Sequence, residues 1–460
     1  MEINHLNALR LGFSTKENTK IKEAGVNKYI KHQLNGNLSI SEPSFIQNSP
    51  RSIQEIQELR RKSENGGKDI ESVAKQLNQL SFEWKAYILS RCHETNFPLR
   101  EKINLFFQNH FVCTLQSVKV PYWIYKYYET IHTHSLGNYK NLVKEIVYSN
   151  AVIKYLDNHK NKRDSINENL GRELLELFTL GEGNYSESDI KNTALALAGL
   201  TFGEEKGKYR PFLKDNSTKT VLGKSGNFII DDVIDIIFEQ KSTAYLLAEK
   251  TLKWFFYDVP HSDKIKKYGD CLLKNNFELK PFFQTLFEEE CKNEMGGNQI
   301  KNPLIFMFQI FHDLNLKPNY KLMAFILKNQ SMDIYDQPNV KGWKGGQNWL
   351  TSQIYLERNQ LIDFIVSGNA KYQKILNKRL EKFNAGEISF SPIFNISDKK
   401  NAKSILNELI QRMIFEKNED IQNELNQLLK YDFDPNAENA DKAILKVYQY
   451  LAKTPEFQII

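Results

Sequence analysis

The amino-acid sequence predicts an all-α fold, a large multi-helix orthogonal assembly with one small irregular or hairpin insertion. Apolar residues recur three and four positions apart in one segment after another, as on the buried face of a helix. Proline, serine, asparagine and glycine mark the ends of these segments, where helices start and stop. The chain has 460 residues, of which 41% are hydrophobic and 12% aromatic, so it can bury a large aromatic core.

The helical segments follow one another with few interruptions. Pro98 suits the first turn of its helix, because its missing N–H would find no intrahelical acceptor there. Ser186, with Asp189 at the third position, marks a second helix start. Residues 201–226 are the least helical and could hold a short hairpin, with 209–213 and 220–222 as its strands. The other expected helices are 51–80, 80–91, 98–111, 120–134, 138–156, 165–180, 186–199, 231–259, 262–275, 280–292, 300–314, 350–366, 371–383, 402–415, 420–429 and 440–452.

Two parts are expected along the chain. Residues 1–383 form the main helical domain, which includes the 201–226 excursion and a loop at 337–349 rich in glycine and tryptophan. Residues 384–460 form a smaller helical lobe packed on that domain. A polar linker at 384–400 sets the boundary between them.

Charge and composition argue against a nucleic-acid-binding protein and a membrane-spanning protein. The formal net charge is +6, from 62 basic and 56 acidic residues, which is too mild an excess to favour nucleic acid as a partner. No window approaches the roughly 18 apolar residues that a membrane span needs. The first residues lack a basic stretch followed by an apolar core, so no signal peptide is recognised and the cytoplasm is the expected location. The four cysteines have no CxxC spacing and are expected to be free thiols.

The 165–185 segment is the most conspicuous stretch. Ser165 and Glu168 are spaced as a capping box at a helix start. Gly181 stands where a left-handed residue would end the helix. An apolar stripe at helical spacing is formed by Leu170, Leu174, Leu177 and Phe178. Polar candidates for a site lie beside it: Asn167, Glu168, Asn169, Arg172, Glu173 and Glu176.

A second candidate is His110, which shares the apolar face of the helix that starts at Pro98. A histidine on such a face is most often a core residue bonded to a backbone carbonyl. Alternatively, it is a general base or a single metal ligand that faces the polar helix, with Asn109 orienting a ligand.

The polar helix also supports two interpretations. On a solvated face, Arg172 and Glu176 would be an ordinary pair four residues apart. On a buried face, Arg172 would have to neutralise Glu173 or Glu176, since unpaired buried carboxylates are costly. Two carboxylates beside one arginine and one histidine suit acid/base chemistry or an oxygen-rich metal site, and equally suit a structural polar knot.

The 337–349 loop has one proline, three glycines and two tryptophans. It is not a phosphate-binding P-loop, because Lys341 precedes the glycines and no serine or threonine follows in register. Trp343 and Trp349 either pack beneath the loop or stack on a ligand ring.

Several blocks of the chain, in order, carry a family resemblance. They are Arg10-Leu11-Gly12-Phe13 after His5; Pro98-Leu99-Arg100-Glu101-Lys102 with Asn109-His110-Phe111; the NEN…RELLELFTLGEGNY block at 167–185; Asn339-Val340-Lys341-Gly342-Trp343 with Gly345-Gly346; and Thr454-Pro455-Glu456-Phe457-Gln458. Over nearly the whole chain, this pattern resembles the bacterial domain-of-unknown-function 1800 family.

The resemblance implies a bacterial, mostly helical protein whose gene is often found beside that of a sulfatase-like partner, with no established activity. The chain departs from the family pattern at two histidines, where Gln108 and Lys214 stand instead. If those histidines bind metal in relatives, this chain has lost at least two ligands.

Two hypotheses for function follow. In the first, the chain is an enzyme with His110 as base or ligand, Glu173 and Glu176 as acid/base groups or ligands, and Arg172 as their charge partner. The 337–349 loop would roof that site, and a divalent metal is a possible cofactor. In the second, the same residues form a buried polar network in a binding or assembly protein. A short distance from His110 to either glutamate in an accessible pocket would favour the first; packing that fills this space would favour the second.

Overall fold

Helices make up most of the chain, as the sequence predicts. The computed structural model describes residues 2–65, 70–292, 296–297, 299–368, 370–383, 385–386, 388–414, 419–429 and 433–460. The α-helices in this part are α1 (Ile3–Leu11), α2 (Asn18–Ala24), α3 (Val26–Asn35), α4 (Ser44–Gln47), α5 (Ile53–Asn65), α6 (Ile70–Glu94), α7 (Pro98–His110), α8 (Leu115–Val118), α9 (Pro121–His134), α10 (Tyr139–Val147), α11 (Asn150–Tyr155), α12 (Asn169–Glu173), α13 (Glu187–Leu197), α14 (Ile230–Ile237), α15 (Lys241–Phe255), α16 (Ser262–Lys274), α17 (Leu279–Glu290), α18 (Pro303–Asp313), α19 (Tyr320–Asn329), α20 (Ser352–Ser367), α21 (Ala370–Leu380), α22 (Ala402–Met413), α23 (Glu419–Leu428) and α24 (Ala440–Ala452).

The short helical turns and strands complete the described elements. The turns are η1 (Thr15–Glu17), η2 (Asn158–Lys160), the π-helix η3 (Leu174–Thr179), η4 (Pro211–Leu213), η5 (Gly346–Trp349), η6 (Glu381–Phe383) and η7 (Pro455–Gln458). The strands are β1 (Leu200–Thr201), β2 (Lys208–Tyr209), β3 (Lys219–Val221) and β4 (Lys224–Gly226).

The predicted insertion contains two antiparallel hairpins instead of one. Strand β1 pairs with β2, and β3 pairs with β4. The 209–213 strand is wrong beyond Tyr209, because the chain turns into η4 at Pro211. Proline has no N–H to donate to a strand ladder, so it favours the turn.

Two helix starts follow the local signals. Pro98 is the first residue of α7. Ser186 and Asp189 form a complete capping box at the start of α13. Each signal needs only residues within one turn, which explains why the sequence predicts them well.

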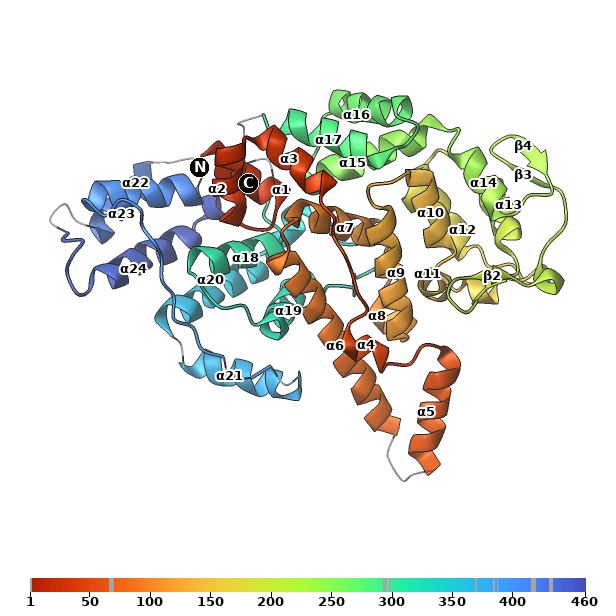
Figure 1. Cartoon of the computed structure of the whole chain (residues 1–460), viewed down its shortest axis with the longest axis horizontal. Helices are drawn as coiled ribbons and strands as arrows, with labels where there is room; N and C mark the ends of the chain where they lie inside the picture. Colours follow the sequence, from red (N-terminus) through yellow and green to blue (C-terminus); the bar gives the residue numbers. More distant parts are fainter. Residues whose placement is uncertain are drawn as a thin grey trace.

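The molecule is elongated in Figure 1, with the hairpins at one end and α22, α23 and α24 at the other. Helices α5 and α6 form an arm that projects from the body. The first and last residues lie near each other: Ile300 pairs with Ile459 in a short bridge, and Leu6, Leu9, Ile305 and Ile460 pack together.

The main hydrophobic core extends through the whole chain. Its largest cluster of buried residues runs from Ala8 to Phe457 and includes side chains from α22 and α24. The division at residue 383 stays a prediction; Asn384, with which the expected lobe begins, lies outside the described residues.

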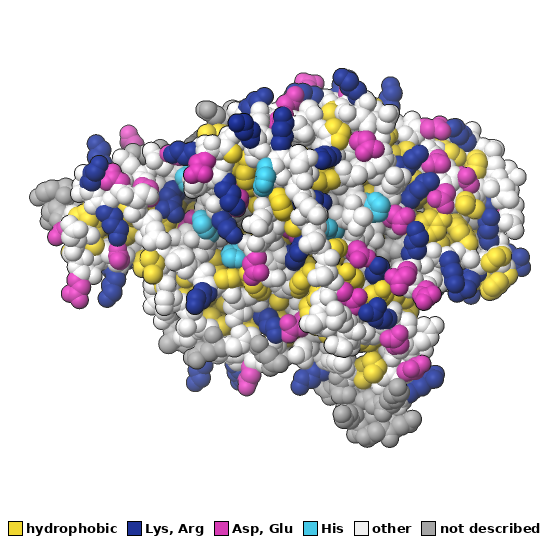
Figure 2. Space-filling model, in the orientation of Figure 1, with side chains coloured by type: hydrophobic (Ala, Val, Ile, Leu, Met, Phe, Trp, Pro, Cys, Tyr) yellow, Lys and Arg dark blue, Asp and Glu magenta, His cyan; other side chains and the backbone are white. Residues whose placement is uncertain are grey.

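The described chain has a surface of mixed charge and free thiols. None of its helices is long and apolar enough to cross a membrane. Basic and acidic side chains are interspersed on the face in Figure 2. The four cysteines are free, as their spacing predicts.

Candidate functional site

The helix in the 165–185 segment begins four residues later than predicted. The backbone groups of Ser165 bond to those of Lys162, and α12 starts at Asn169. The side chain of Asn167 accepts the Asn169 N–H at 3.0 Å. Asn167, and not Ser165, therefore bonds the first N–H group of the helix. The predicted Ser165–Glu168 capping box is therefore wrong. The cause is Asn161, a buried residue whose side chain accepts the Asn167 N–H at 3.0 Å and holds the chain outside the helix.

The same helix widens before it ends. After α12 the backbone continues as the π-helix η3, in which the Leu180 N–H donates to the Leu175 carbonyl. The Thr179 hydroxyl donates to the Leu174 carbonyl at 2.6 Å. The predicted stripe is buried, and Gly181 has the expected left-handed φ of 83°. Single π-turns within helices often mark functional or strained sites.

His110 lies at the C-terminal end of α7, only 5% exposed, as its apolar face predicts. Its Nε2 is 2.7 Å from the Tyr139 hydroxyl and 3.3 Å from the Phe178 carbonyl. The Tyr139 hydroxyl itself donates to the Phe178 carbonyl. Nε2 must then carry the ring proton and donate to the Tyr139 oxygen, which leaves Nδ1 as an acceptor.

That acceptor faces Lys250 on α15. The Lys250 Nζ is 3.3 Å from Nδ1 of His110 and donates to the Leu177 carbonyl at 2.7 Å. Burial, and secondarily the charge of Lys250, hold the pKa of His110 well below its usual range, so the ring is neutral at pH 7. Burial lowers the pKa of Lys250 to about 8. The lysine, the histidine and Tyr139 thus surround the carbonyl end of η3.

The two glutamates have different surroundings. Glu176 is half-buried, accepts from the Tyr185 hydroxyl at 3.0 Å and lies 3.3 Å from the Lys341 Nζ. Glu173 is also half-buried, but its carboxyl has no hydrogen bond or ion pair within the described residues. Burial, followed by the charge of Glu176, raises the pKa of Glu173. Glu173 therefore holds its proton to a higher pH than an ordinary glutamate does.

Arg172 does not pair with Glu173 or Glu176, contrary to the prediction. Its guanidinium donates two bonds of 3.0 Å to Glu187, and one bond of 3.2 Å to Glu168. Side chains on a helix lean toward its N-terminus, which brings Glu168 within reach. The wider turns of η3 remove Glu176 from the regular position four residues on. Asn169 is exposed at the start of α12.

The 337–349 loop docks on the end of α7. The Asn109 side chain accepts the Trp343 N–H at 2.9 Å, and Lys341, whose side chain is 64% exposed, reaches Glu176. Trp343 and Trp349 are each 6% exposed, with Trp343 stacked 6.4 Å from Trp254. The indoles pack beneath the loop, so the packing interpretation is confirmed.

The structure thus separates the predicted residues into four groups, one of which, Asn109 and Trp343, joins the 337–349 loop to α7. His110 belongs to a buried network. Glu173, Glu176 and Lys341 lie at its outer side, while Arg172, Glu168, Asn167 and Asn169 serve the start of α12. Sequence reasoning missed Lys250 and Tyr139. Lys250 lies within an ordinary amphipathic helix, and only the preceding Asn138, which caps α10, distinguishes the position of Tyr139.

Among the described residues, no group of three or more His, Cys, Asp or Glu side chains is placed to hold a metal ion. The arrangement offers proton donors and acceptors: a neutral histidine, a lysine of lowered pKa and a glutamic acid of raised pKa. Such shifts occur both at functional sites and in structural networks.

Comparison with known proteins gives one match. A family model described as "Protein of unknown function (DUF1800)" matches residues 5–459. Neither the curated proteins nor the solved structures provide a match. The match spans nearly the whole sequence, including every block that carries the resemblance, and the chain therefore belongs to the DUF1800 family.

Proposed function

We propose that this chain is a non-catalytic binding or assembly protein, in which His110, Tyr139 and Lys250 form a structural polar network. One observation carries the proposal: both ring nitrogens of His110 are engaged by protein groups. A general base needs a lone pair that faces the substrate, whereas the lone pair of Nδ1 faces the ammonium of Lys250. A sulfatase-like protein is the first candidate partner, on the basis of the family resemblance.

The network has a clear structural purpose. The carbonyls of Leu177 and Phe178 lie at the end of η3, and Phe178 is almost fully buried. A buried carbonyl without a donor costs about 1–3 kcal/mol. Lys250 donates to the first carbonyl, and Tyr139 with His110 serves the second. The side chains therefore stabilise a helix end that the backbone alone would leave poorly bonded.

Replacing Tyr139 with phenylalanine tests this role. We expect the free energy of unfolding to fall by about 1–2 kcal/mol, since the change removes a buried hydroxyl that bonds both His110 and the Phe178 carbonyl. Urea denaturation followed by circular dichroism measures it. Tyr245→Phe is the matched control, because the hydroxyl it removes bonds Asp270 near the surface. If Tyr139→Phe were as stable as the natural chain, the structural role would be wrong.

A second candidate function is acid/base catalysis at Glu173. It is favoured by a half-buried carboxyl without a described partner, whose pKa is raised by burial. The Glu176 side chain lies beside it, bonded to Tyr185 and close to Lys341. Two carboxyls in unlike surroundings are the usual arrangement for one proton donor and one base. In this alternative Glu173 would be the donor.

The pH dependence of stability tests the state of Glu173. Its folded pKa lies above the ordinary value of 4.5, so between the two values the folded state holds more protons than the unfolded state, and the natural chain loses stability as the pH rises through that window. Glu173→Gln cannot ionise and should melt at a higher temperature than the natural chain at pH 7.5, with no gain at pH 4. Glu182→Gln, at an exposed position, should show neither effect. A gain of equal size at both pH values would contradict the raised pKa.

A further inference from the structure

Three adjoining cavities meet at Phe325 and Asn329 on α19, far along the chain from the network above. Their volumes are about 790 Å³, 570 Å³ and 120 Å³, and each is lined by both residues. We call them together the α19 groove. Helices α6, α20 and α21 and the turn η6 supply its other walls, and Figure 1 shows α21 beside this part of the body. A space of this size accommodates an extended ligand of several rings.

The largest cavity has an aromatic wall and a neutralised polar cluster. Phe82 and Phe383 stack with ring centroids 3.8 Å apart. Lys85 is bonded to Asp333 and lies 2.8 Å from Asp336, so the lysine compensates much of the charge of the two carboxylates. Their oxygens are acceptors for hydroxyl groups, while the rings suit the apolar C–H face of a sugar.

The smallest cavity contains acceptors without donors. Gln330 is only 1% exposed, and its Oε1 has no hydrogen-bond partner among the described residues. The buried Oε2 of Glu357 likewise has none, although its other oxygen accepts from Gln353. Buried polar atoms in folded proteins are almost always bonded to protein, water or ligand. A water molecule or a ligand group that reaches these oxygens must therefore present an O–H or N–H group.

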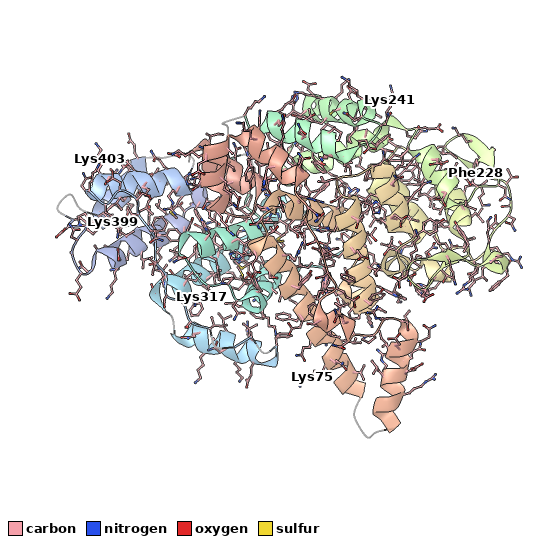
Figure 3. All side chains as sticks on the ribbon, in the orientation of Figure 1. Lys75, Phe228, Lys241, Lys317, Lys399 and Lys403 are labelled. Atoms are coloured by element: carbon pink, nitrogen blue, oxygen red, sulfur yellow. The ribbon has the colours of Figure 1, made fainter. Side chains whose placement is uncertain are left out.

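Cations surround the groove. Lys75, Lys378 and Arg379 line it, are exposed and have no ion pair within the described residues. Figure 3 shows Lys75 on the half of α6 that projects from the body. Unpaired cations around a cleft attract an anionic ligand and raise its local concentration.

We propose that the α19 groove binds an acidic oligosaccharide, a chain of sugars that carry carboxylate groups. Its hydroxyls would donate to Asp333 and Asp336, its apolar ring faces would lie on Phe325 and Phe383, and its carboxylates would pair with Lys378 and Arg379. An acidic peptide fits less well, because its backbone amides and carbonyls need paired partners and the groove walls are helices with satisfied backbones. The proposal rests on the binding role proposed above and gives that role a ligand class.

Isothermal titration of the full chain with hexagalacturonate and hexamannuronate tests the proposal. We expect saturable binding of at least one acidic hexasaccharide, and at least tenfold weaker binding by the double variant Lys378→Ala/Arg379→Ala. Asn329→Ala removes a neutral side chain common to the three cavities and should also weaken binding severalfold. These side chains are exposed, so the variants should keep the melting temperature of the natural chain.

Controls separate this outcome from nonspecific attraction. Lys241→Ala removes an exposed cation at the start of α15, on the opposite side of the view in Figure 3, and should leave affinity unchanged. Maltohexaose, which is neutral, should bind at least tenfold more weakly. Binding of neither acidic hexasaccharide, equal losses in Lys241→Ala, or hexaglutamate binding as tight as the sugars would overturn the proposal. Tyr139→Phe probes a network outside the groove, so either proposal can fail alone.

Discussion

Replacing Lys102 with methionine is expected to lower the free energy of unfolding by about 4 kcal/mol. Lys102 lies on α7, almost fully buried, and its ammonium donates to the carbonyls of Leu9, Arg10 and Gly12 at 2.8, 3.0 and 2.9 Å. These carbonyls end α1, where no further N–H of the helix can reach them. The lysine therefore joins two helices by bonding the end of one from the side of the other.

The three acceptor carbonyls determine whether Lys102→Met destabilises or stabilises the protein. A buried charge is costly, and replacing it with an apolar group is sometimes stabilising. Burial lowers the pKa of Lys102 to about 7, however, so at pH 8 the amine can release its proton and still donate its two N–H groups to two of the three carbonyls. Methionine gains little from the absence of charge at that pH. It leaves without a donor the two backbone carbonyls that the neutral amine bonds, at about 1–3 kcal/mol each.

Urea denaturation at pH 8 provides the measurement. Lys28→Met on α3 is the control, because Lys28 is exposed and the change should stay within about 0.5 kcal/mol. A loss below about 1 kcal/mol for Lys102→Met would mean that other donors reach the end of α1.

The second large effect is expected for Gly342→Ala, at about 3 kcal/mol. Gly342 has φ of 80°, which strains any residue with a Cβ. A Cβ there would also lie 2.4 Å from the side-chain oxygen of Asn109 and 2.8 Å from its backbone oxygen. The loop must move away from α7, which breaks the bond from the Trp343 N–H and withdraws Lys341 from Glu176.

Tryptophan fluorescence reports this movement directly. Trp343 is buried against Trp254, so displacement of the loop should shift the emission to longer wavelength. Gly183→Ala is the matched control: its φ is 84°, but a Cβ there meets nothing within 4 Å. It should show only the conformational cost, about 1 kcal/mol, without the spectral shift. Equal effects in the two variants would rule out a steric role for Asn109.

The sequence predicts those features that depend on neighbouring residues. The helix start at Pro98, the Ser186–Asp189 box, the buried side of His110 and the turn at Gly181 all follow from signals within one or two turns. The Ser165 box fails because Asn161, outside the motif, bonds Asn167 and delays the helix. The local pattern was present, but the bond to Asn161, six positions before Asn167, was stronger.

The set of residues that meet at the site cannot be predicted from neighbouring positions in the sequence. Lys250 is 140 positions from His110, and no spacing in the sequence connects them. Arg172 had three acidic neighbours along its own helical segment and one on α13, and the bidentate bond to Glu187 decided its orientation. A long side chain can reach several charged partners, so the partner that it bonds depends on the packed structure more than on sequence distance.

The π-helix η3 affects how positions in this segment should be compared between chains. A π-turn contains one residue more than an α-turn, so it is equivalent to a one-residue insertion within a helix. A related chain with a regular α-helix here would need a gap in its alignment between 174 and 179. Without that gap, every residue after the insertion would be assigned to the wrong helical face, and the equivalents of Leu177 and Phe178 would be misidentified.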